Sequence, residues 1–356
     1  MRKINILDTT LRDGSYAINF SFTADDTAVI CRELEGAGIE YIEIGHGVGL
    51  NASNAGHGVA AATDEEYMAA ARRSLKKSKY GMFCIPGIAN LTDLDLAADH
   101  GMDFIRIGTN VDAIEKAEPF IQKAKKSGML VAANFMKSYA LSPKEFALKV
   151  KQAESYGADI VYFVDSAGGM LPRTIDDYIH AVRKKTKVDF GFHGHNNLGL
   201  AMANTLRAAE LGVRFIDASL QGLGRSSGNA CTEILVAALA KCGVKTGVNF
   251  LRLLKIGQKY IQPLITKRGE AALDIVSGYA EFHSSYMPKI LKCAAKYQVD
   301  PEILIIEVCK ISRVDVDEEK LNVAARKISK KMKRNRSSFL DGCMLTRYVG
   351  GEQENK

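Results

Sequence analysis

At the centre of this chain lies the stretch Gly191-Phe192-His193-Gly194-His195-Asn196-Asn197-Leu198-Gly199. It follows Lys187-Val188-Asp189-Phe190, which predicts the start of a β-strand. Side chains two residues apart on a strand point to the same side, so His193 and His195 project together, close enough to bind one metal ion. Two histidines in this pattern are also common as ordinary buried or edge residues, and the triplet alone leaves both interpretations open.

A carboxylate far away in the sequence could complete a metal site. Asp13 stands in Asp8-Thr9-Thr10-Leu11-Arg12-Asp13-Gly14, directly after a short apolar run. Two imidazoles and one carboxylate leave coordination positions open, which is what a catalytic metal ion needs. The combination therefore predicts a catalytic rather than a structural metal site.

The composition is that of a globular intracellular protein. The chain has 356 residues, of which 47% are hydrophobic and 25% charged, and a single barrel domain uses ~250 residues. The seven cysteines are scattered, with no CxxC pair, which is typical of a reducing compartment. No apolar segment opens the chain, and no apolar run approaches the ~20 residues of a membrane span. We expect a soluble, cytoplasmic protein without a membrane partner.

The net charge of +7 gathers in short basic runs. Two of them follow predicted helices, where basic residues complement the helix dipole and form a solvated face. The third, from Lys330 to Arg336, could be an interaction tail. No aromatic interleaving or nucleic-acid motif accompanies these runs, so we expect no nucleic-acid partner.

Short apolar runs alternate with longer amphipathic stretches through the first two thirds of the chain. Thr63 and Ser142 open two of these stretches with capping boxes. Repeated alternation of strand and helix predicts a parallel sheet with helices outside it, and eight units predict a closed α/β (β/α)₈ TIM barrel. The predicted strands are Ile4–Leu7, Tyr41–Ile44, Tyr80–Ile85, Phe104–Ile107, Leu130–Asn134, Ile160–Val164, Val188–His193 and Phe215–Ala218.

The barrel prediction brings the polar motifs together. Active sites of this fold lie at the C-terminal ends of the strands, and the motifs fall at those positions. Arg12 and Asp13 follow the first strand, Ser166 the sixth, and the two histidines end the seventh. This convergence favours the metal site over two structural histidines.

After the eighth unit the pattern changes. We expect a catalytic barrel over residues 1–245, a smaller all-helical domain over 246–330, and a basic and polar tail over 331–356 that is poorly ordered. The helices expected in the second domain are Phe250–Thr266, Met287–Tyr297, Pro301–Cys309 and Glu318–Ile328.

The motifs of the barrel resemble those of the metal-dependent pyruvate aldolases with HMG-CoA lyase-like barrels, most of all the members that cleave 4-hydroxy-2-oxovalerate. The stretch from Ser284-Ser285 to Asp300 also resembles that family's C-terminal domain. The motifs are Thr10-Leu11-Arg12-Asp13-Gly14, Ile42-Glu43-Ile44-Gly45-His46-Gly47-Val48-Gly49-Leu50, Val164-Asp165-Ser166-Ala167-Gly168, Phe192-His193-Gly194-His195-Asn196-Asn197-Leu198-Gly199 and Gly228-Asn229.

The resemblance implies a reaction and a cofactor. The enzyme would cleave a 4-hydroxy-2-oxo acid to pyruvate and an aldehyde by retro-aldol chemistry, with a divalent ion holding the 2-oxo acid. Asp13, His193 and His195 would bind the ion, and Asn229 is a further candidate ligand. Imidazole and carboxylate ligands suit Mn²⁺, with Mg²⁺ or Co²⁺ as alternatives.

The resemblance also implies roles for substrate-binding residues. Arg12 would stabilise the enolate oxygen, and Ser166 would bind the substrate carboxylate beside His193. The structural alternatives are a barrel-mouth salt bridge for Arg12 and a helix cap for Ser166.

One part of the site departs from the family pattern. In the resembling aldolases a histidine three residues after the aspartate takes the proton of the C4 hydroxyl, and a tyrosine precedes a Ser-Ser pair in the helical domain. Here those positions are Tyr16 and His283. We hypothesise that the two form the same pair in reverse, with His283 as the base, because a neutral imidazole suits this role and an unperturbed tyrosine does not. The alternative is that the two residues never meet.

Two other functions are alternatives. An acyl-CoA-dependent Claisen-type synthase is disfavoured by the short helical tail, and a scaffold without activity by the retained arginine, aspartate and histidines. The family's aldolases work with an acylating aldehyde dehydrogenase that contacts the helical domain. Here the segment Lys310-Ile311-Ser312-Arg313-Val314-Asp315-Val316-Asp317-Glu318 lacks the expected glycine-rich turn. The sequence therefore leaves open whether such a dehydrogenase binds this chain, and a homo-oligomer is the alternative assembly.

Overall fold

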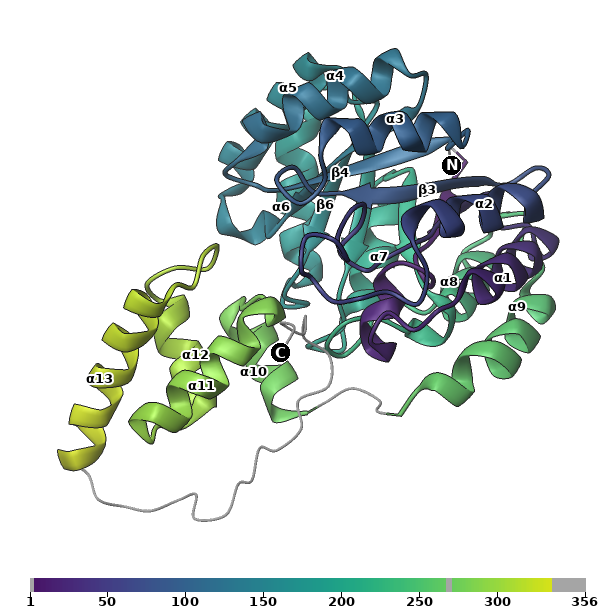
Figure 1. Cartoon of the computed structure of the whole chain (residues 1–356). Helices are drawn as coiled ribbons and strands as arrows, with labels where there is room; N and C mark the ends of the chain where they lie inside the picture. Colours follow the sequence, from purple (N-terminus) through teal and green to yellow (C-terminus); the bar gives the residue numbers. More distant parts are fainter. Residues whose placement is uncertain (1–2, 267–270, 335–356) are drawn as a thin grey trace.

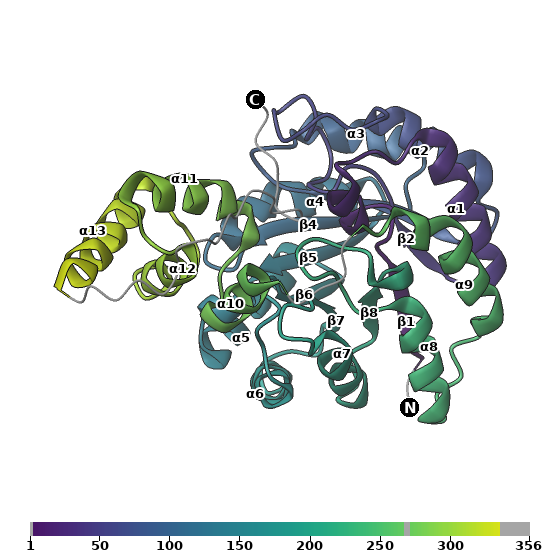
Figure 2. The same ribbon diagram turned by 90° about the horizontal axis from the view of Figure 1, so that it is seen from below.

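The computed structural model describes residues 3–266 and 271–334. Eight parallel strands form a closed barrel in sequence order, and β1 pairs with β8 to complete it (Figure 2). The fold prediction is confirmed. The strands are β1 (Asn5–Asp8), β2 (Tyr41–Glu43), β3 (Lys79–Cys84), β4 (Phe104–Asn110), β5 (Leu130–Met136), β6 (Ile160–Asp165), β7 (Asp189–Gly194) and β8 (Phe215–Ala218).

The strand ends differ from the sequence prediction in two places that matter for the site. β4 and β5 continue in register past the predicted ends, as far as the pair Asn110 and Met136. β7 ends at Gly194, so His195 lies one residue beyond the strand. A backbone bridge to Asn229 holds His195 there.

Helices α1 to α8 surround the barrel (Figures 1 and 2). The predicted capping boxes at Thr63 and Ser142 are both present. Gly157 ends α5 in the left-handed conformation that glycine adopts without strain. The helices are α1 (Ala24–Ala37), α2 (Asp64–Ser74), α3 (Leu91–Asp99), α4 (Glu118–Lys126), α5 (Pro143–Tyr156), α6 (Pro172–Arg183), α7 (Ala201–Glu210) and α8 (Thr232–Lys241).

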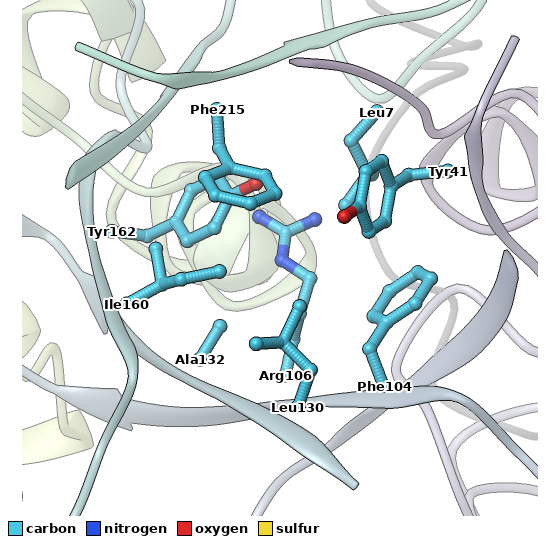
Figure 3. A pocket seen from close by; sticks show the side chains of 9 residues that line it. All are labelled: Leu7, Tyr41, Phe104, Arg106, Leu130, Ala132, Ile160, Tyr162 and Phe215. Atoms are coloured by element: carbon cyan, nitrogen blue, oxygen red, sulfur yellow. The ribbon is translucent and has the colours of Figure 1, made fainter. Parts of the chain in front are cut away.

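The floor of the barrel is a layer of apolar and aromatic side chains. Figure 3 shows Tyr41, Phe104, Tyr162 and Phe215 around the guanidinium of Arg106. The Arg106 guanidinium lies 4.2 Å from the centre of the Tyr162 ring, within the range of a cation–π contact. These side chains leave a pocket of only about 10 Å³ at this end of the barrel.

The C-terminal part is helical, with three differences from the prediction. The helix predicted over Phe250–Thr266 is α-helical only to Ile256, and a π-helical turn (Gly257–Ile261) and a 3-10 turn (Gln262–Leu264) follow it. Helix α10 (Ala272–Ala280) was not predicted, and α13 (Glu318–Arg334) continues into the segment expected to be a poorly ordered tail. Residues 335–356 of that tail lie outside the described residues. The other helices are α9 (Phe250–Ile256), α11 (Met287–Tyr297) and α12 (Pro301–Cys309).

The packing of these helices bears on the division of the chain. The α9 residues Leu253 and Ile256 belong to the core cluster of the barrel. A second apolar core begins at Leu273 and continues to Ile328. The boundary at residue 245 stays a prediction, and we propose that the helical unit begins after Ile265.

The helical unit reaches the open end of the barrel (Figure 1). Ser226 donates to Asp274 at 2.9 Å, and Lys137 Nζ donates to the Tyr286 hydroxyl at 3.1 Å. Arg225 donates to the hydroxyl of Ser284. These contacts place His283, the residue before Ser284, at the mouth of the barrel.

Within residues 3–266 and 271–334, no helix is both long and apolar enough to span a bilayer. The six cysteines of this part of the chain are all free thiols. The expectation that the cysteines do not form a disulfide framework is confirmed for these six.

Candidate active site

A small cavity lies at the C-terminal ends of the strands, under the helical unit. Its volume is about 60 Å³. Seven of the eight predicted site residues line it: Arg12, Asp13, Tyr16, Ser166, His193, His195 and His283. The eighth, Asn229, bonds directly to Asp13.

Three of these residues form a cluster that could hold a metal ion. Asp13, His193 and His195 are buried, and each offers one ligand atom within 4.8 Å of the others. The two imidazole rings stand nearly perpendicular, with their centres 5.0 Å apart. The sequence prediction that β7 and the loop after β1 bring these side chains together is therefore correct.

His193 is oriented by a carboxylate behind it. Its Nδ1 donates to Asp217 Oδ2 at 2.9 Å, which leaves the lone pair on Nε2. Burial alone would raise the pKa of Asp217, but Arg106 and His193 together hold that pKa below its usual value. An ionised carboxylate that fixes the tautomer of a histidine is the usual support of a metal-binding imidazole.

His195 is a neutral imidazole. Burial, followed by the charge of Arg225, holds its pKa well below the usual value. Nε2 accepts a hydrogen bond from Arg225 Nη2 at 2.9 Å, while Nδ1 has no hydrogen-bond partner within the described residues.

Asp13 is the negative group of the cluster. It accepts hydrogen bonds from Arg12 Nη1 at 2.8 Å and from Asn229 Nδ2 at 2.7 Å. Burial opposes ionisation of Asp13, but the charge of Arg12, with smaller contributions from His195 and His193, holds its pKa well below the usual range. The carboxyl group is therefore ionised at neutral pH.

Asn229 is held against Asp13 by the loop after β8. An added Cβ at Gly224 would lie 2.4 Å from Asn229 Nδ2, so only glycine leaves room for the amide. The other amide atom, Oδ1, is buried and has no partner within the described residues. Such an orphaned oxygen beside three ligand atoms is a further donor that a cation could use.

The donor set fits a divalent ion, with one adjustment. A neutral imidazole has a single lone pair, and that of His195 is now shared with Arg225. An ion bound through this nitrogen would therefore release the guanidinium. Two imidazoles, one carboxylate and an amide oxygen are ligands typical of first-row divalent ions.

Arg12 forms a salt bridge at the barrel mouth, which is the structural role that the sequence analysis gave as its alternative. Its Nε donates to Glu43 Oε2 at 2.7 Å, while Nη1 donates to Asp13. Glu43 is fully buried and also accepts from Arg106 at 2.9 Å. Arg12 also lines the cavity, so the salt bridge fixes its position without removing it from the site.

Arg106 connects the floor of the barrel to the cluster. Its guanidinium donates to Glu43, to Asp217 at 2.7 Å and to Asn134 at 2.9 Å. Arg106 therefore holds both the carboxylate that orients His193 and the carboxylate that positions Arg12.

We expect Arg106→Met to destabilise the protein by about 3–5 kcal/mol, because it leaves Glu43 and Asp217 buried without their shared counter-charge. Urea denaturation measures the loss. The matched control is Arg73→Met, since Arg73 makes an exposed ion pair with Asp25 whose removal costs below about 1 kcal/mol. Equal, small losses for both variants would contradict the assignment.

Ser166 stands at the cavity wall after β6. Its Oγ accepts a hydrogen bond from the backbone N–H of Lys137 at 2.9 Å, which leaves the hydroxyl proton to be donated. The helix-cap alternative is not found, since the residue before α6 is Leu171. Lys137 has positive φ, and this turn after β5 points its N–H at Ser166.

Tyr16 and His283 both line the cavity, from opposite parts of the chain. Tyr16 packs edge-on against Phe20 at 5.3 Å between ring centres, and His283 Nδ1 lies 2.7 Å from the hydroxyl of Ser285. Burial, then the charges of Arg225 and Lys137, hold the pKa of His283 well below its usual value. A direct hydrogen bond between Tyr16 and His283 stays a prediction.

Two residues of the site were not predicted. Asp217 lies in a predicted strand. Alternation along β8 could have indicated that it points to the same side as Phe215, two residues earlier, which pairs with Asn5 of β1. Arg225 lies in the loop after β8, and an arginine in a glycine-rich loop at a barrel mouth is itself a signal.

The closed barrel and the Asp-His-His cluster at its mouth define a class of barrel enzyme able to hold a divalent ion. The HMGL-like family model matches residues 3–259. The chain belongs to the HMGL-like family.

Relatives are similar over almost the whole chain. A 4-hydroxy-2-oxovalerate aldolase from Carboxydothermus hydrogenoformans is 39% identical over 94% of this chain and 99% of its own length. A 4-hydroxy-2-oxovalerate aldolase 2 from Nocardia farcinica is 40% identical over 86% of this chain and 89% of its own length. The HMG-CoA lyase of Brucella melitensis superposes with a TM-score of 0.64 at 22% identity, over 75% of this chain and all of that structure, and shows the same fold.

These comparisons distinguish the aldolase from the two alternative functions. They confirm the prediction of a carbon–carbon lyase of the aldolase type and give no support to the acyl-CoA-dependent synthase. The resemblance of the motifs to HMG-CoA lyase-like aldolases is confirmed as well.

Proposed function

We propose that the enzyme cleaves a 4-hydroxy-2-oxo acid, such as 4-hydroxy-2-oxovalerate, to pyruvate and an aldehyde, with Mn²⁺ as the preferred ion and Mg²⁺ or Co²⁺ as substitutes. One observation carries the proposal. Asp13, His193 and His195 meet Arg12 in one buried cavity of a chain 39% identical to a 4-hydroxy-2-oxovalerate aldolase.

Asp13, His193 and His195 are the proposed ligands, with Asn229 Oδ1 as a fourth. The ion, when bound, supplies a Lewis acid for the keto group of the substrate. The chain supplies the rest of the electrostatics, since Arg12 stands beside Asp13 with its guanidinium fixed by Glu43. We assign Arg12 to the oxygen of the developing enolate.

Ser166 is the proposed ligand of the substrate carboxylate. Because its Oγ already accepts from Lys137 N–H, its own proton is available to a carboxylate oxygen. Bound there, the substrate has its keto carbon near His193, and its C4 hydroxyl extends toward the helical unit.

His283 is the proposed base. In the structure Nδ1 accepts from the backbone N–H of Ser285 at 3.3 Å and lies 2.7 Å from the Ser285 hydroxyl. To act as the base, the ring takes the other tautomer, in which Nδ1–H donates to that hydroxyl in place of the backbone bond, and Nε2 then has a lone pair to take the proton of the C4 hydroxyl. The C4 oxygen then forms the aldehyde carbonyl, the C3–C4 bond breaks, and its electron pair passes to C3 to give the enolate. Protonation of C3 yields pyruvate. Tyr16, on the same cavity, is the proposed partner of His283.

We expect pyruvate to be released from 4-hydroxy-2-oxopentanoate, to disappear when EDTA removes the ion, and to return when Mn²⁺ is added back in excess. Coupled oxidation of NADH by lactate dehydrogenase follows the product. Release of pyruvate that is unaffected by EDTA would exclude the metal-dependent reaction, and no release at all would exclude this substrate.

The location and assembly belong to the same proposal. We place the enzyme in the cytoplasm, in keeping with the free thiols of the described chain. We propose that it acts as a homo-oligomer without an acylating aldehyde dehydrogenase, because the turn between α12 and α13 lacks glycine. Gel filtration of the enzyme, alone and mixed with such a dehydrogenase, tests this.

A further inference from the structure

Arg225 is a buried cation that makes no direct ion pair within the described residues. Arg225 is only 5% exposed to solvent. Its hydrogen-bond partners are the Ser284 hydroxyl, the Ser166 carbonyl oxygen and His195 Nε2, all uncharged. No carboxylate of the described chain lies within ion-pair distance of it. Burying a charge in this way is unfavourable unless an anion completes the site.

The other buried arginines at this end of the barrel are paired. Arg12 has Asp13 and Glu43, and Arg106 has Glu43 and Asp217. The contrast matters because it shows that the fold supplies carboxylates where a guanidinium is structural. At Arg225 the fold supplies none, although the side chain lines the cavity.

The loop after β8 holds Arg225 rigidly in place. Ser226 has positive φ and donates to Asp274 of α10 at 2.9 Å. The backbone N–H of the next residue, Ser227, donates to Asn197 Oδ1 at 3.2 Å. Contacts to both the barrel and the helical unit therefore preorganise the guanidinium before substrate arrives.

The position of Arg225 selects one part of the substrate. Its Nη1 bonds to Ser284, the residue next to the base His283, so it lies beside the C4 hydroxyl rather than beyond Ser166. A guanidinium has five N–H donors, of which three are engaged in this structure, one of them with His195 Nε2. An ion bound to His195 would release that one, so up to three donors can bind a carboxylate carried on C4.

Charge balance points the same way. The charged side chains that line the cavity are Arg12, Asp13 and Arg225, and the first two pair with each other. A monocarboxylate held at Ser166 would leave Arg225 without an anion. A second carboxylate on the aldehyde side of the molecule would neutralise it.

We propose that Arg225 binds a second carboxylate, so that the preferred substrate is a 4-hydroxy-2-oxo dicarboxylic acid that yields pyruvate and a 2-oxo acid carrying the aldehyde group. The inference rests on the proposed retro-aldol function and specifies its substrate class. The reaction balances as before, since the extra carboxylate stays on the C4 fragment.

The test compares 4-hydroxy-2-oxopentanoate with its diacid, 4-hydroxy-2-oxopentanedioate, on the Mn²⁺-loaded enzyme. Pyruvate is measured by chromatography, because the diacid also releases glyoxylate, which lactate dehydrogenase reduces. We expect kcat/KM to favour the diacid by at least about tenfold. Arg225→Met should lower kcat/KM for both substrates, and for the diacid at least about tenfold more than for the monoacid, with the extra loss mostly in KM.

Arg225→Lys keeps the charge without the planar fork, and it should retain part of the preference. An unmodified enzyme that favours the monoacid, or neither substrate, overturns the inference even if Arg225→Met fails to fold. Equal losses on both substrates in Arg225→Met also overturn it, because they would assign Arg225 to the C1 carboxylate or to structure. If the unmodified enzyme releases pyruvate from neither compound, the proposed function itself has failed.

Discussion

Asp13→Asn is expected to abolish metal binding and to lower kcat/KM on the order of 10³-fold, with the fold intact. The substitution keeps the size of the side chain and removes the one negative charge of the cluster. It also introduces an amide N–H where Arg12 and Asn229 both donate, so at least one donor would face another donor. Bound Mn²⁺ per chain, measured by mass spectrometry of the dialysed protein, gives a readout independent of turnover.

The control for Asp13→Asn lies on the same barrel. Asp189 begins β7 at the opposite end from the cluster and pairs with Arg214 in a partly exposed position. Asp189→Asn should leave the metal content unchanged and alter kcat/KM by less than about threefold. Normal metal content in Asp13→Asn would remove Asp13 from the ligand set.

The stability of Asp13→Asn carries a second, pH-dependent signature. The pKa of Asp13 is depressed in the folded state, so its ionisation stabilises the fold above the unfolded pKa, and that stability is lost as the pH falls. The difference in stability between the unmodified protein and Asp13→Asn should therefore stay constant from pH 7 down to about 4, and shrink only as the pH falls further below the usual carboxyl pKa of 3.8.

The positions of the site residues along the barrel could be predicted because the fold is periodic. Once eight strands are assigned, every residue that directly follows a strand lies at the same, C-terminal end of the barrel. Alternation along the strand then places the side chains of His193 and His195 on the same side. The sequence says less about which polar groups then touch. The bond between Arg225 and His195 joins two loops, and no local pattern contains it.

The helical unit was harder to predict for a different reason. Helix α10 has a largely apolar sequence around Gly278, and its close approach to the barrel depends on that glycine and on Gly169. An added Cβ at Gly169 would lie 2.1 Å from the Gly278 carbonyl oxygen. Such close packing between segments far apart in the sequence is invisible to periodicity. It is also what brings His283 over the cavity.

This packing brings Tyr16 and His283, the two positions where residue types are exchanged relative to the resembling aldolases, to the same cavity from different elements. His283 comes from the helical unit, whereas Tyr16 comes from the 3-10 turn Asp13–Ile18 that also carries Asp13. The proposed base is therefore separate from the element that carries a proposed metal ligand. A change at His283 should then affect proton transfer without disturbing the cluster.

His283→Ala is expected to lower kcat by about 10²- to 10⁴-fold while the metal content stays normal. Removing the imidazole leaves the C4 hydroxyl without its base, whereas Asp13, His193 and His195 are untouched. The rate should partly return on addition of free imidazole. Enol-to-keto exchange of pyruvate protons, followed by NMR in deuterated buffer, separates the enolate half of the reaction from cleavage.

The pH profile of the unmodified enzyme tests the same assignment. Because burial and the charges of Arg225 and Lys137 lower the pKa of His283, the neutral base persists below pH 6.5, and the acidic limb of kcat/KM should fall below that value. The limb should move to higher pH in Arg225→Met, which removes one of the two charges. His100→Ala, at a partly exposed histidine on the outer helices, is the matched control and should change neither kcat nor the limb. Unchanged turnover in His283→Ala would assign the proton transfer to Tyr16 or to water instead.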